Sequence, residues 1–178
     1  IKNSELYNYL KPSTSASLKL EDITLAQYFR EQFSKNYFYD WKTNDERFAI
    51  YQKLYKNQKH HKGRSDDHRA KFKATTPWQL PFNYQNGEKV SAYALRHLAR
   101  QHKMVDVAMM YRFDDKNEEY INYFTEQMRS LNAAVEANKY ETIKSGNGVF
   151  EVFRSGYRVL NWLEIHSLFL GEEAYSDE

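Results

Sequence analysis

Three long segments with apolar residues at helical spacing dominate the second half of the chain. They cover residues 91–112, 117–137 and 149–170, and a short turn with Asp114 and Asp115 separates the first from the second. Two long helices joined by so few residues lie antiparallel as an αα-hairpin. The pattern therefore predicts an all-α fold of antiparallel helical hairpins, an arrangement that suits a solenoid or a toroid.

The composition agrees with helices and excludes several kinds of site. Six glycines and three prolines in 178 residues are few chain breakers, which favours helices over many short strands. The absence of cysteine excludes disulfides, thiolate metal sites and cysteine nucleophiles. A formal charge of +2 predicts no partner by itself, and no apolar run is long enough to cross a bilayer. Aromatic residues make up 16% of the chain and suit core packing, interfaces and stacking on sugars.

The remaining segments are predicted to belong to the same single domain, residues 1–178. Residues 1–20 include a polar, Ser-rich stretch and are interpreted as an N-terminal arm. Two further helices are expected between this arm and Tyr55. Residues 56–90 have the weakest periodicity, and we expect them to form a long irregular loop that carries basic residues and Trp78.

The segment 149–170 is apolar almost all round, which predicts a helix buried on most sides. Glu151, Arg154, Arg158 and Asn161 interrupt it at spacings of three, four and three, so they share one face. Buried charges are costly unless they are paired. The stripe is therefore either a buried ion network or the wall of a water-filled cleft, where arginine forks would bind carboxylate or sulfate.

Two other groups of basic residues are candidates for anion binding. Arg96, Arg100 and Lys103 share a helix face beside His97, and this face is either plain solvated surface or part of a site. The run from Lys53 to Lys73 is either soluble loop or a surface for a polyanion. Its histidines lack convergent carboxylates, so no metal site is predicted. The sequence has no phosphate-binding glycine loop, nucleophile elbow or zinc-protease motif.

Several short motifs occur in an order that resembles a known enzyme family. They are Ala94–Leu98, Ala108–Asp115, Tyr120 with Phe124, and Gly156–Trp162. Together they resemble the N-terminal helical domain of heparinase II/III-type polysaccharide lyases over about residues 90–170. The turn differs, because Phe113-Asp114-Asp115 stands where the family usually has Thr-Gly-Asp.

The resemblance implies part of an incomplete (α/α) toroid at the N-terminal end of a longer enzyme. Such enzymes cleave acidic glycosaminoglycans, here heparan sulfate or a similar chain, by β-elimination. The reaction neutralises the uronate carboxylate, removes the C5 proton and protonates the leaving oxygen. The family's catalytic residues lie later in the protein, so no catalytic residue is assigned here. The resemblance further implies no cofactor, the C-terminal remainder of the enzyme as partner, and a periplasmic or secreted location.

Six residues are predicted to bind substrate. Arg158, Asn161 and Trp162 match one family motif, and Arg96 and His97 match another. The resemblance implies that these residues line or support the substrate cleft. Arg154 is added because it shares a helix face with Arg158.

Other functions remain open at this point. A non-catalytic helical module that binds acidic polysaccharide would share the basic and aromatic residues and differ only in turnover. Nucleic-acid binding through Lys53 to Lys73 would show a steep salt dependence, but the near-zero net charge argues against it. A scaffold for protein partners would show no affinity for anions.

Overall fold

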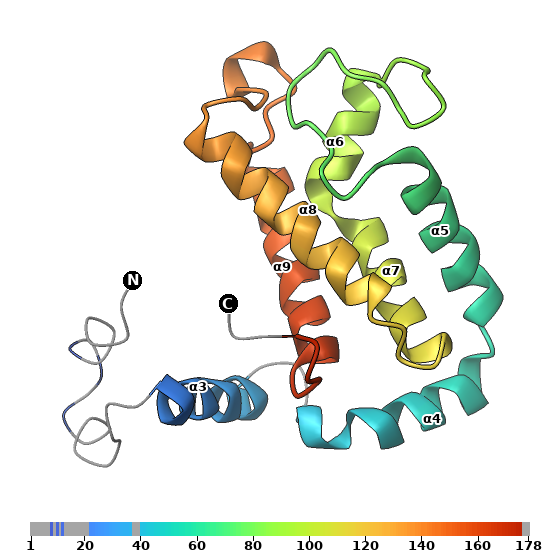
Figure 1. Cartoon of the computed structure of the whole chain (residues 1–178), viewed down its shortest axis with the longest axis vertical. Helices are drawn as coiled ribbons and strands as arrows, with labels where there is room; N and C mark the ends of the chain where they lie inside the picture. Colours follow the sequence, from blue (N-terminus) through green and yellow to red (C-terminus); the bar gives the residue numbers. More distant parts are fainter. Residues whose placement is uncertain (1–7, 9, 11, 13–21, 37–39, 176–178) are drawn as a thin grey trace.

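The computed structural model describes residues 8, 10, 12, 22–36 and 40–175. This part of the chain folds into seven α-helices without any strand, which confirms the all-α prediction (Figure 1). The predicted arm 1–20 lies almost entirely outside the described residues. The helices are α3 (Asp22–Asn36), α4 (Asn44–Tyr55), α5 (Gln58–Lys71), α6 (Ala92–Arg100), α7 (His102–Phe113), α8 (Glu119–Glu136) and α9 (Val152–Phe169).

Helix α7 lies at the centre of the fold and packs against α5, α8 and α9 (Figure 1). The chain turns back between α7 and α8, as the short turn predicted. Most of α7 is apolar and buried, so it supplies one side of the main core. The largest buried partners from the neighbouring helices are Tyr120, Ile121, Phe124, Ile165, Leu168 and Phe169.

A second core holds the segment that leads into α6. Trp78 is only 1% exposed, and its indole Nε1 donates to Ser130 Oγ on α8 at 2.9 Å. The Trp78 carbonyl accepts from the backbone N–H of Glu141 at 2.9 Å, and the Glu141 carboxylate accepts from the N–H of Leu80, also at 2.9 Å. These bonds tie the segment before α6 to the segment after α8. The core between them includes Leu95, Leu98, Ala99, Leu131 and Val149.

The single helix predicted over 91–112 is wrong in one respect, because the structure breaks it at Gln101. This residue adopts a left-handed backbone conformation with φ of 59° and ends α6 before α7 begins. Its side chain is 2% exposed, and its amide nitrogen donates to Leu98 O at 2.9 Å and to Gln127 Oε1 at 2.8 Å. The buried bond to α8 supports a conformation that sequence periodicity does not reveal.

The prediction of an irregular loop over 56–90 is wrong for its first part, which forms α5. Helix α5 is polar along most of its length, so it lacks the apolar period by which helices are recognised. Helix α5 is instead packed along α7, where Arg64 pairs with Asp106. Within the helix Lys62 pairs with Asp66 and Asp67 with Lys71, but these pairs are exposed and add little stability.

The expectation that the last helix is buried on most sides is also wrong. Helix α9 begins only at Val152, and its outer side is open among the residues described, with Val152 84% and Leu160 58% exposed. The inner side packs against α6 and α7. None of the helices in the described part combines the length and the apolar character needed to cross a membrane.

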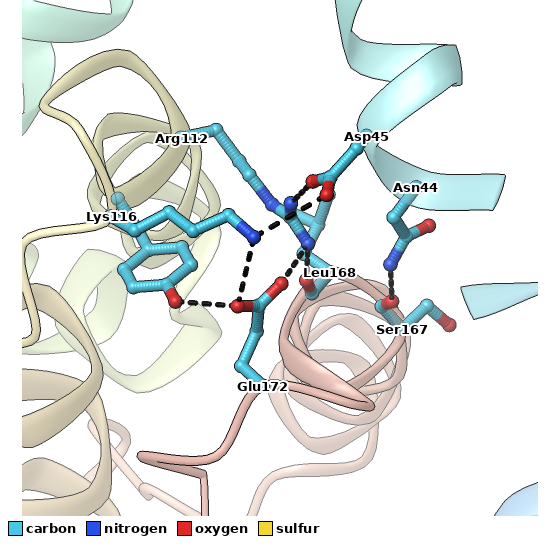
Figure 2. A network of polar contacts seen from close by, with 8 residues as sticks. Asn44, Asp45, Arg112, Lys116, Ser167, Leu168 and Glu172 are labelled. Atoms are coloured by element: carbon cyan, nitrogen blue, oxygen red, sulfur yellow. Dashed lines mark hydrogen bonds and ion pairs between the residues drawn. The ribbon is translucent and has the colours of Figure 1, made fainter. Parts of the chain in front are cut away.

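A polar network attaches α4 to α7 and to the turn after α9 (Figure 2). The Arg112 guanidinium pairs with Asp45 and Glu172 and donates to Leu168 O at 3.2 Å. Lys116 approaches the same two carboxylates at 3.4 and 3.3 Å. The hydroxyl of Tyr111 donates to Glu172 Oε2 at 2.7 Å, and burial, together with this contact, raises the pKa of Tyr111. The two cations and the two carboxylates of this network therefore balance each other's charge.

Replacing Trp78 tests the second core. Trp78→Ala leaves a cavity between α6 and α8 and removes the bond to Ser130, so we expect the free energy of unfolding to fall by about 3–5 kcal/mol. Leu54 is 67% exposed on α4, and Leu54→Ala should change stability by no more than about 0.5 kcal/mol. Urea unfolding followed by circular dichroism measures both values, and equal losses would contradict the assignment.

The buried His68 predicts a dependence of stability on pH. Burial first, and then the nearby charge of Lys103, lower the pKa of His68 to about 4 in the folded chain. The unfolded chain takes up this proton at its ordinary pKa, so stability falls as pH drops from neutral toward about 4, by up to about 3 kcal/mol. Unfolding of the wild type and of His68→Gln across this range should show a shallower loss in the variant. Parallel curves would contradict the expectation.

Candidate functional site

Arg158, predicted to bind substrate, is buried at the contact between α6 and α9. The residue is 3% exposed. Its Nη1 atom donates to the carbonyls of Ala99 at 2.8 Å and Val149 at 2.9 Å, and its guanidinium lies 4.9 Å from the ring centre of Phe150. Burial lowers the pKa of Arg158 to about 10, so it stays charged at neutral pH. In this position the guanidinium joins the end of α6 to the start of α9.

Arg154 and Glu151 stabilise the first turn of α9. The Glu151 carboxylate accepts from the backbone N–H groups of Phe153 at 3.1 Å and Arg154 at 3.3 Å, as an N-terminal cap does. The guanidinium of Arg154 is nearly buried and donates to Gly148 O at 2.8 Å, with Glu151 Oε2 at 3.7 Å. The two arginines of the stripe are therefore buried, and backbone carbonyls accept from their guanidinium groups.

Asn161 and Trp162 continue this buried layer along α9. The amide nitrogen of Asn161 donates to Arg100 O at 2.7 Å. Trp162 is half-buried and touches both cores, and the Arg158 guanidinium lies 5.6 Å from its ring centre. The buried indole nitrogen of Trp162 has no hydrogen-bond partner among the residues that the structure describes. The three motif residues thus fix α9 against the end of α6.

Above this layer, α6 and α9 present a surface of basic and aromatic side chains. The ring of Tyr93 lies 4.3 Å from that of His97 and 6.0 Å from the guanidinium of Arg96. The guanidinium of Arg100 lies 5.1 Å from the ring centre of Phe153 on α9. We call this surface the basic–aromatic face, and it consists of Tyr93, Arg96, His97, Arg100, Phe153 and Tyr157.

The positive charge of this face is not compensated locally. No carboxylate in the described ranges forms an ion pair with Arg96, His97 or Arg100. Burial lowers the pKa of His97, and Arg100, Lys103 and Arg96 lower it further. Such a cluster of cations attracts anions, and a bound anion would favour the protonated form of the imidazole.

Exposed aromatic rings complete the face, and sequence reasoning missed them. Tyr93 is 65% exposed, and Phe153 and Tyr157 are about half exposed, with their ring centres 4.7 Å apart. Their spacing of four residues on one helix was visible in the sequence. Neighbouring positions are apolar too, so the pattern predicts a buried helix and does not single out exposed rings.

Only half of the other basic group is paired, because Lys53, Lys56, Lys59 and Lys73 are exposed and form no ion pair in the described part of the chain. Arg64, Lys62, Lys71 and Arg69 all pair with carboxylates. Within residues 22–36 and 40–175 no group of three or more His, Asp or Glu side chains is arranged to hold a metal ion. We place the candidate site on the basic–aromatic face because its unpaired cations lie beside exposed aromatic rings.

The structure sorts the six predicted residues into two layers. Arg96 and His97 lie on the basic–aromatic face, whereas Arg154, Arg158 and Trp162 lie beneath it and Asn161 joins the two. Their part in substrate binding stays a prediction. No protein family, curated protein or solved structure matches the chain. The function is accordingly inferred from the geometry of the face itself.

Removing the Arg158 side chain tests the buried layer. Arg158→Ala leaves two carbonyls without their charged donor, so we expect a loss of about 3 kcal/mol or more in the free energy of unfolding. Arg129 forms an exposed pair with Glu126 on α8, and Arg129→Ala should cost no more than about 0.5 kcal/mol. Chemical denaturation of both variants measures the difference. Similar losses would show that the guanidinium does not hold α6 to α9.

Proposed function

We propose that this domain is the N-terminal helical part of a lyase that cleaves an acidic glycosaminoglycan, heparan sulfate or a similar chain, by β-elimination. In this proposal the domain supplies substrate-binding surface and not the catalytic acid or base. The observation that carries it is the basic–aromatic face, where Arg96, His97 and Arg100 lack carboxylate partners in the described structure and lie beside exposed rings.

The chemistry of an acidic sugar fits such a face. Guanidinium forks bind carboxylate and sulfate through two parallel hydrogen bonds. Aromatic rings offer large apolar faces to the C–H surfaces of a sugar ring, and Tyr93, Phe153 and Tyr157 are exposed enough to do so. Uncompensated charge also raises the local concentration of an anionic chain. Arg154, Arg158, Asn161 and Trp162 support the face by fixing α6 against α9.

The arrangement of helices is proposed to continue into an incomplete (α/α) toroid. Val152, Val159 and Leu160 leave an apolar strip on the outer side of α9, and a further helical pair from the remainder of the enzyme would cover it. This remainder would supply the base and the acid. The proposed substrate implies a periplasmic or secreted protein, and none of the proposed steps requires a cofactor.

Binding of a sulfated oligosaccharide tests the face directly. We expect a heparan sulfate octasaccharide to bind the chain, and Arg96→Gln combined with Arg100→Gln to weaken it by about tenfold or more. The matched control is Lys53→Gln with Lys59→Gln, which removes two exposed charges from α4 and α5 and should change affinity by less than about twofold. Isothermal titration calorimetry at constant ionic strength measures all three. Equal weakening in both variants would reject the face as the site.

The pH dependence and the turnover provide further readouts. Bound sulfate raises the pKa of His97, so affinity should rise as pH falls through the titration of this imidazole, and His97→Gln should remove that rise.

The chain should release no unsaturated uronate, which absorbs in the ultraviolet. Steady release would show that a base and an acid lie within these 178 residues. Binding without turnover in the longer enzyme would instead favour a non-catalytic module for acidic polysaccharide.

A further inference from the structure

A cavity of about 320 Å³ lies away from the basic–aromatic face, between α4, α5, α7 and α9. Its walls are largely apolar, with Phe48, Val105, Met109 and Leu168 among them. Small-molecule sites are typically concave and apolar, with a few polar groups that orient the ligand. The polar groups that lack a partner at this cavity therefore determine which ligand it can bind.

Asn44 provides one unused hydrogen-bond acceptor. The residue is 5% exposed at the start of α4 and lines the cavity. Its amide nitrogen donates to Ser167 O at 2.8 Å, and Figure 2 shows the amide oxygen directed away from that bond. This oxygen, Oδ1, is buried and has no hydrogen-bond partner in the described part of the chain. A buried acceptor without a hydrogen-bond donor destabilises the folded state unless water or a ligand donates to it.

Glu164 provides a second acceptor. Its side chain, on α9, lines the cavity and is half-buried. None of the hydrogen bonds or ion pairs found among residues 22–36 and 40–175 involves its carboxylate. Burial raises the pKa of Glu164, the charge of Asp106 raises it further, and His61 acts in the opposite direction. A cationic partner would remove the cost of burying this carboxylate.

The donors at the cavity are already engaged. Arg112 contacts two carboxylates and a carbonyl (Figure 2). The ring of His61 contacts Asp106 Oδ1 at 2.8 Å through Nδ1 and the hydroxyl of Tyr51 at 2.6 Å through Nε2. The Nε atom of Arg47 donates to the hydroxyl of Thr43 at 2.9 Å. Asn44 Oδ1 and the Glu164 carboxylate, by contrast, have no partner within the described ranges.

Two aromatic rings also line the cavity. Phe48 and Tyr51 both line it, in a stacked arrangement with ring centres 6.1 Å apart. The face of an aromatic ring carries partial negative charge and attracts cations. An amide oxygen, a carboxylate and two rings thus surround one apolar space.

We propose that this cavity binds a small molecule with a primary ammonium group on an apolar body. The ammonium N–H groups donate to Asn44 Oδ1 and to the Glu164 carboxylate, and the apolar body lies against Phe48, Val105 and Met109. A primary ammonium fits better than a quaternary one because both acceptors need N–H donors. The site is separate from the proposed glycan-binding surface, because it shares no residue with the basic–aromatic face.

Titration of the full chain with benzylamine, which is protonated at neutral pH, tests the proposal. We expect saturable chemical-shift changes in ¹H–¹⁵N spectra, and Glu164→Gln should weaken binding by about tenfold or more. The matched control is Glu126→Gln, which removes a carboxylate from the exposed side of α8 and should leave the affinity unchanged. Melting temperature reports on folding, and Glu164→Gln should melt no lower than the wild type because burial disfavours the charged carboxylate.

Benzyl alcohol has no ammonium group, and benzyltrimethylammonium has no N–H donor. The proposal would be overturned if either bound as tightly as benzylamine. It would also be overturned by absence of saturable binding or by equal affinity in Glu164→Gln. Affinity should fall as pH drops because Glu164 becomes neutral. His61, Arg47, Arg112 and Tyr51 also line the cavity, and the charge of Asp106 acts on Glu164 from nearby. The pH dependence assigned to Glu164 is therefore the part that Glu164→Gln removes.

Discussion

The fold depends on how the end of α6 is completed. The last carbonyls of a helix have no partner within it, and they carry the negative end of the helix dipole. Here the guanidinium of Arg158 binds the carbonyl of Ala99, and the amide of Asn161 binds that of Arg100. Both donors come from α9, which is more than fifty residues away in the chain. The same guanidinium binds Val149 O, so one buried charge fixes the end of one helix and the start of another.

This arrangement explains why a lone cation can be buried without a carboxylate. The guanidinium of Arg158 carries several donors, and it has two carbonyls and two aromatic faces as partners. Arg154 and Arg158 on α9 are buried, whereas Arg96 and Arg100 on α6 are partly exposed. The two pairs of arginines look alike in the sequence, and only their different burial distinguishes them.

The sequence was informative where local pattern decides structure. The helical segments of the second half, the turn with Asp114 and Asp115, and the shared face of Arg154 and Arg158 could all be predicted. Tertiary contacts decided the rest. The break at Gln101 is accompanied by a buried bond to α8, and the polar helix α5 is packed along α7. The exposed rings of the candidate site and the cavity could not be found because both require knowing which helices are neighbours.

The interruption at Gln101 has a mechanical consequence. A continuous helix transmits displacement along its hydrogen-bond ladder, but the ladder between α6 and α7 stops at this residue. A ligand that displaces the side chains of α6 therefore moves this short helix, and the displacement does not continue along the backbone into α7. The displacement passes sideways, through Arg158 and Asn161, into α9. Helix α9 packs against α7 and lines the cavity with Glu164 and Leu168, so a displacement on α6 reaches the cavity through α9 and not along one continuous helix.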